Sequence, residues 1–82
     1  MTVADALRRA CDDLRTAGVE GSRLDAEVLL SRAVGRGRAW LHGYADRPLD
    51  EASGERFRAW IGRRCAGEPV AYLTGEREFC SL

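Results

Sequence analysis

The chain has 82 residues, of which 45% are hydrophobic and 32% are charged, and its thirteen basic residues balance thirteen acidic ones. This length allows one small core, in which folding buries only about 60% of the surface of the unfolded chain. The balanced charge excludes a chain-wide field that would attract nucleic acid or an anionic membrane. No apolar run approaches the roughly 20 residues that span a bilayer, and the N-terminus lacks the order of a signal peptide, so we expect a cytoplasmic protein.

The first predicted helix begins at Thr2, a candidate cap, and ends at Gly18. Small and apolar side chains recur along it at helical spacing, which indicates one buried face. They are Val3, Ala6, Leu7, Ala10, Leu14 and Ala17.

A second helix is predicted from Ser22 to Gly35, where the Ser22 hydroxyl and the Asp25 carboxylate can satisfy the free N–H groups of the first turn. Its wide apolar face predicts a central place in the core. That face comprises Leu24, Val28, Leu29, Ala33 and Val34. Asp25 and Glu27 diverge by roughly 200° around a helix, so we interpret them as capping and salt-bridging residues rather than as an acid–base pair.

Two further helices follow, a short one over residues 38–42 and a long one capped by Asp50. One face of the long helix is predicted to be buried. It carries Ala52, Phe57, Trp60, Ile61 and Cys65. The glycines at residues 35–37 end a helix and do not form a dinucleotide fingerprint. We interpret the aromatic side chains as core packing rather than as platforms for nucleic acid bases. They are Trp40, Phe57, Trp60, Tyr72 and Phe79.

The end of the chain reads as a joint between two kinds of structure. Gly67 can end the long helix, Pro69 suits the first position of another, and Gly75 can end that one. Residues 76–82 then read as strand-like. With short connections throughout, the sequence predicts an all-α fold, a small antiparallel bundle of four to five helices over residues 1–75 with a short extended tail over residues 76–82.

Cysteine and histidine are too sparse to indicate a disulfide framework or a metal site. Cys11, Cys65 and Cys80 are odd in number and far apart, which favours reduced thiols that serve in packing. His42 stands alone, so we interpret it as a structural or solvated side chain.

Three stretches resemble the PrmC/HemK family, methyltransferases that modify a glutamine side chain in peptide chain release factors. Gly-Glu-Pro-Val-Ala-Tyr-Leu-Thr-Gly at residues 67–75, followed by Arg-Glu-Phe, is similar to the family's junction motif. Arg-Leu-Asp-Ala-Glu-Val-Leu-Leu at residues 23–30 resembles its second-helix signature, and the pair Arg63-Arg64 shortly before Gly-Glu-Pro also fits its pattern. Cys80 departs from the aromatic residue that many members carry there. The family's Asn-Pro-Pro-Tyr motif and cofactor-binding glycine loop do not occur in these 82 residues.

The resemblance implies that this chain is the N-terminal release-factor-binding domain, a fragment, of a protein-(glutamine-N5) methyltransferase that uses S-adenosyl-L-methionine. Residues 76–82 would begin the linker hairpin to a methyltransferase domain, which would hold the cofactor and modify the glutamine of the Gly-Gly-Gln loop. The chain itself would carry no catalytic, cofactor-binding or metal-binding residues and would be inactive alone. The implied partners are the release factor and the methyltransferase domain, with no nucleic acid and no membrane.

Five residues are candidates for contact with a partner or with the other domain. They are Arg63, Arg64, Tyr72, Arg77 and Phe79. The two neighbouring arginines fall in the last turn of the long helix, where a cation both favours the helix C-terminus and can reach a partner's carboxylate.

Two alternatives from other classes stay open at this point. One is a free-standing helical adaptor that derives from the same domain and has no enzymatic activity. The other is a helix-turn-helix nucleic acid binder, against which the balanced charge counts.

Overall fold

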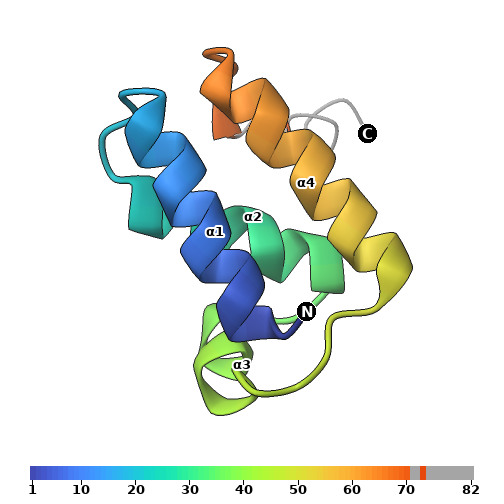
Figure 1. Cartoon of the computed structure of the whole chain (residues 1–82). Coiled ribbons are helices and arrows are strands. Elements are labelled where there is room, and N and C mark those ends of the chain that lie inside the picture. The colour runs from blue at the N-terminus through green and yellow to red at the C-terminus, as the bar shows by residue number, and fades with distance from the viewer. Residues whose placement is uncertain (71–72, 74–82) are drawn as a thin grey trace, which may run out of the picture.

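The computed structural model describes residues 1–70 and 73, and that part of the chain is all-α (Figure 1). Its helices are α1 (Val3–Thr16), α2 (Ser22–Val34), α3 (Arg38–Gly43) and α4 (Glu51–Cys65). Val70 and Leu73 are also helical. The predicted all-α bundle is confirmed, whereas the predicted tail over residues 76–82 lies outside the described residues.

The bundle is built from two helices that run in the same direction and one that runs back across them (Figure 1). Residues 45–49 bind the first residues of α1, so α1 and α4 start at the same end. At the other end, the Cys65 thiol of α4 lies 3.7 Å from the Asp13 carbonyl oxygen of α1. An ion pair between Arg64 and Asp25 brings the end of α4 to the start of α2. The direction of α2 is therefore opposite to that of both neighbours.

Side-chain caps start α1 and α4 as the sequence predicts. The Thr2 hydroxyl accepts from the Asp5 N–H at 3.1 Å, and the Asp5 carboxylate accepts from the Thr2 N–H at 3.3 Å. The hydrogen bonds from Thr2 lower the pKa of Asp5. At α4 the Asp50 carboxylate accepts from the Ser53 N–H at 3.0 Å, which likewise lowers the pKa of Asp50. These bonds satisfy N–H groups that a helix start leaves without a partner.

The start of α2 differs from the prediction. Gly21, in the left-handed region with φ of 68°, occupies the cap position, and no side chain caps the helix. The expected cap from Ser22 and Asp25 is therefore wrong, because the Asp25 carboxylate turns toward Arg64 of α4.

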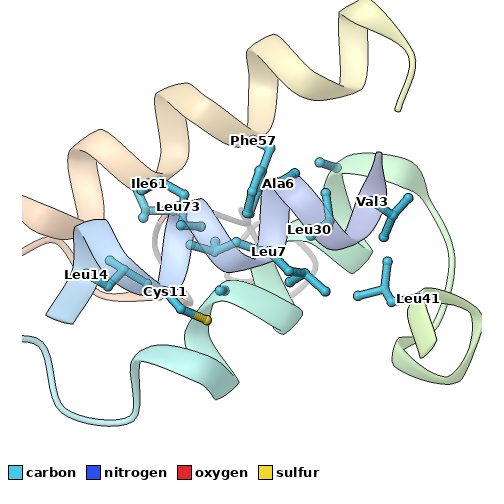
Figure 2. Packing of buried hydrophobic residues seen from close by; sticks show 14 residues of the cluster. Val3, Ala6, Leu7, Cys11, Leu14, Leu30, Leu41, Phe57, Ile61 and Leu73 are labelled. Carbon is cyan, nitrogen blue, oxygen red and sulfur yellow. The ribbon is translucent and has the colours of Figure 1, made fainter. Parts of the chain in front are cut away.

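One hydrophobic core joins all the helices, and Figure 2 shows its side chains filling the space between α1, α2 and α4. The helices α1 and α2 contribute both alanines and leucines to the core, while Phe57 and Ile61 close it from α4. The buried hydrophobic residues are Val3, Ala6, Leu7, Ala10, Cys11, Leu14, Ala26, Leu29, Leu30, Ala33, Leu41, Phe57, Ile61 and Leu73. Trp40, Trp60 and Cys65 pack against this core while partly exposed.

Three residues that the sequence assigns to buried faces are exposed instead. Leu24 is 50% exposed, because it lies roughly 200° around α2 from the buried Ala26. Ala52 is exposed because it lies about 140° around α4 from Phe57. Ala17 is exposed because α1 has already ended at Thr16.

Candidate functional site

The two neighbouring candidate arginines lie at the end of α4, and both bind groups of this chain. Arg63 makes a forked pair with the Glu68 carboxylate, at 3.0 Å from Nε and 2.8 Å from Nη2. Arg64 donates from Nε to the Asp25 carboxylate at 3.0 Å and from Nη1 to the Glu68 carbonyl oxygen at 3.2 Å. Arg64 and Asp25 are 23% and 18% exposed, so water screens this pair only in part. The arginines thus fix the turn after α4 to the start of α2.

The backbone of that turn explains why a glycine follows the two arginines. Gly67 has φ of 104°, and its N–H donates to the Arg64 carbonyl oxygen while the Glu68 N–H donates to the Arg63 carbonyl oxygen. This pair of bonds is the Schellman arrangement that ends a helix with a left-handed residue. The Gly-Glu-Pro part of the junction motif therefore has a local structural role, with Leu73 bonding back to the Pro69 carbonyl oxygen at 3.2 Å.

The other three candidate residues fall in the part of the chain that the structure does not describe. They are Tyr72, Arg77 and Phe79. Their assignment to a partner or interdomain surface stays a prediction, as does that of the two arginines.

A buried carboxylate in the middle of α2 was not among the candidates. Glu27 is only 4% exposed and accepts hydrogen bonds from Arg23 at 2.8 Å and from Arg38 at 3.1 and 3.0 Å. His42 Nε2 lies 3.6 Å from the same carboxylate. Since Arg38 and His42 belong to α3, this cluster holds the short helix against α2.

The charge on Glu27 is maintained by its neighbours. Burial by itself raises the pKa of the carboxyl group, but the hydrogen bonds from Arg23 and Arg38 and the charge of His42 outweigh it and lower the pKa. The hydrogen bond between Arg23 and Glu27 also raises the pKa of Arg23. Glu27 is therefore ionised at neutral pH, and a buried charge of this kind is stable only while its partners stay in place.

Cysteine reactivity has no support among the described residues. Burial raises the pKa of the Cys11 and Cys65 thiols, which disfavours the reactive thiolate. The described part of the chain also holds no group of histidine, cysteine and acidic side chains with metal-binding geometry. Within residues 1–70 and 73, none of the helices has the length and apolarity to cross a membrane.

A shallow groove of about 230 Å³ lies between α1 and α4. Apolar side chains and exposed charged ones line it, among them Ala6, Phe57, Arg9, Asp13 and Arg58. It is smaller than the roughly 300–1,000 Å³ of typical small-molecule sites.

The fold and the ion pairs thus define a small helical domain in which most of the paired charged side chains tie one helix or turn to another. The chain belongs to the family described as the PrmC N-terminal domain, which matches residues 5–75.

Curated relatives carry the name release factor glutamine methyltransferase. The relative from Moorella thermoacetica is 45% identical over the whole chain, which covers 29% of that protein. The relative from Vibrio cholerae is 38% identical over the whole chain and 29% of its own length. The relative from Burkholderia pseudomallei is 52% identical over 72% of this chain and 21% of its own length. The chain therefore spans less than a third of the relatives it matches. No solved structure matches it significantly.

Proposed function

We propose that this chain is the release-factor-binding domain of a protein-(glutamine-N5) methyltransferase that uses S-adenosyl-L-methionine. The observation that supports it is family membership over residues 5–75, together with whole-chain similarity to proteins named release factor glutamine methyltransferase. In this proposal the methyl transfer to the glutamine of the Gly-Gly-Gln loop belongs to a second domain, and this chain grips the protein substrate.

A separate domain that binds the protein substrate has a physical rationale. Contacts remote from the reacting amide provide binding energy that orients a large substrate, which a pocket around one glutamine side chain cannot supply alone. The ion pairs of Arg63 and Arg64 fit such a division, since they hold the turn after α4 against the start of α2 and so fix where the junction motif begins. We propose that these two arginines, with Tyr72, Arg77 and Phe79, serve the connection to the second domain.

Competition with a complete relative tests the proposal. The methyltransferase from Escherichia coli, which is 41% identical over 93% of this chain, would be assayed with its release factor and increasing amounts of this chain. Shared binding predicts a higher apparent KM for the release factor with an unchanged kcat. The KM for S-adenosyl-L-methionine should not move, and calorimetry of the chain with that cofactor should give no binding heat.

Two results would overturn the proposal. One is the absence of both competition and direct binding to the release factor by calorimetry. The other is methylation of the release factor by this chain alone, which would place the chemistry among the residues present here.

A further inference from the structure

The neutral total charge of the chain conceals an uneven distribution. Residues 32–47, from the last turn of α2 to the loop after α3, contain four arginines and one acidic residue. The remaining residues contain nine arginines and twelve acidic residues. This segment of the chain is therefore basic, although the whole chain is not, and one of its arginines, Arg38, pairs with the buried Glu27.

Two of these arginines lie on aromatic rings. The guanidinium carbon of Arg36 lies 5.8 Å from the centre of the Trp40 ring, and that of Arg47 lies 5.3 Å from the centre of the Tyr44 ring. The two rings are themselves 5.2 Å apart with planes tilted by 30°. We call these four residues the α3 face.

The α3 face is exposed and its arginines have no acidic partner among the described residues. Arg36 and Arg47 are exposed, and Tyr44 is 42% exposed. None of the ion pairs within residues 1–70 and 73 includes Arg36 or Arg47. Arg9, Arg56 and Arg58 are likewise absent from these ion pairs. Arg36 and Arg47 differ from them because each also lies over an aromatic ring.

Contacts on both sides hold the α3 face in place. Arg38 and His42 tie α3 to the buried Glu27 carboxylate. The carbonyl oxygens of Ala45 and Arg47 accept from the first N–H groups of α1 at 2.8 and 2.9 Å. A guanidinium that a ring already orients loses less freedom when it binds, which favours affinity.

The chemistry of the α3 face favours carboxylates over nucleic acid bases. Each ring already has the other ring and one guanidinium as neighbours, which leaves less ring surface for a base to stack on. The N–H edges of the guanidinium groups stay open and match the two oxygens of a carboxylate.

We infer that the α3 face docks an acidic segment of the protein substrate, an inference that rests on the proposed function. Asp or Glu side chains of the release factor pair with Arg36 and Arg47, while Trp40 and Tyr44 contribute apolar area beside the ion pairs.

Charge reversal tests the inference. Binding of a bacterial release factor to R36E/R47E should be about tenfold weaker or more, because two attractive contacts become repulsive. The control R9E/R58E has the same net charge and alters the groove between α1 and α4, and it should bind within about twofold of wild type. Thermal unfolding followed by circular dichroism would verify both folds, with R36Q/R47Q as a milder variant.

Crosslinking tests whether the partner presents carboxylates to the α3 face. The chain contains no lysine, so lysines introduced by substitution are its only side-chain amines. R36K/R47K introduces side-chain amines on the α3 face alone, and a carbodiimide joins an amine to a carboxylate in direct contact. Only crosslinks that mass spectrometry assigns to positions 36 and 47 count, since the N-terminal amine and this chain's own carboxylates can also react. We expect crosslinks to an Asp- or Glu-rich segment of the release factor, identified by mass spectrometry, and none from R9K/R58K.

The outcomes separate the two proposals. If the wild-type chain does not bind the release factor, the proposed function is wrong. Binding that survives in R36E/R47E, or that R9E/R58E abolishes instead, overturns the α3 face as the docking surface. Tighter binding to single-stranded oligouridylate than to the release factor, lost in R36E/R47E, would assign the face to nucleic acid and overturn the acidic segment.

Discussion

Replacing Glu27 by glutamine should destabilise the fold, although the shape of the side chain hardly changes. The wild-type carboxylate is 5% exposed and accepts three hydrogen bonds from Arg23 and Arg38. An amide keeps one oxygen as acceptor but loses the charge and turns an N–H₂ group toward a guanidinium. The link between α2 and α3 therefore weakens.

The magnitude follows from how far water reaches the cluster. Hydrogen bonds to charged groups contribute about 1.5–3 kcal/mol when protected, and exposed pairs about 0.2–1 kcal/mol. The side chains of Arg23 and Arg38 are 69% and 51% exposed, which places the cluster toward the weaker end. Glutamine also removes the cost of burying a charge, so we expect a net loss of about 1–2 kcal/mol. In a domain of this size that lowers Tm by roughly 4–16 °C.

Urea unfolding at several pH values would measure this loss. The pKa of Glu27 is lowered in the folded state, so its stabilisation is complete above its ordinary pKa of 4.5. It disappears as the pH falls below that value and through the folded-state pKa, so wild type and E27Q should converge in acid. The exposed Glu20 provides a control, E20Q, that should change stability by less than about 0.5 kcal/mol. Equal stability of E27Q and E20Q at neutral pH, or a gap that does not close in acid, would refute the reasoning.

Other substitutions test the cap, the core and the link at the end of α4. Thr2→Ala removes the hydroxyl of the capping box and should cost about 1 kcal/mol in urea unfolding, whereas T2S should recover most of it; equal losses would show that the hydroxyl is not the cause. Leu41 is fully buried, so L41A should lower the free energy of unfolding by about 2–5 kcal/mol, measured as a lower urea midpoint. A smaller loss would mean that α3 contributes little to the core. A double-mutant cycle with R64A and D25N should give a coupling of about 0.5–1.5 kcal/mol, and additive losses would mean that the two side chains do not act as a pair.

The candidate site was predictable only where its signals were local. The position of Arg63 and Arg64 in the last turn of α4 was predictable from the sequence, and so was the end of that helix at Gly67, which can adopt a positive φ. Glu27 stands four residues after Arg23, a spacing that indicates an ion pair but says nothing about burial. That Arg38 from α3 completes the pair depends on how the chain turns between the two helices.

The sequence by itself determined where most helices begin and end, because caps and left-handed glycines act within one turn of the backbone. Thr2, Asp50 and Gly67 needed no knowledge of the rest of the molecule. Only the tertiary structure decided that Leu24 faces water and that Asp25 binds Arg64 rather than its own helix start. Those outcomes depend on which neighbouring helix lies opposite each face, and burial and ion pairing are properties of two surfaces that no single stretch of sequence contains.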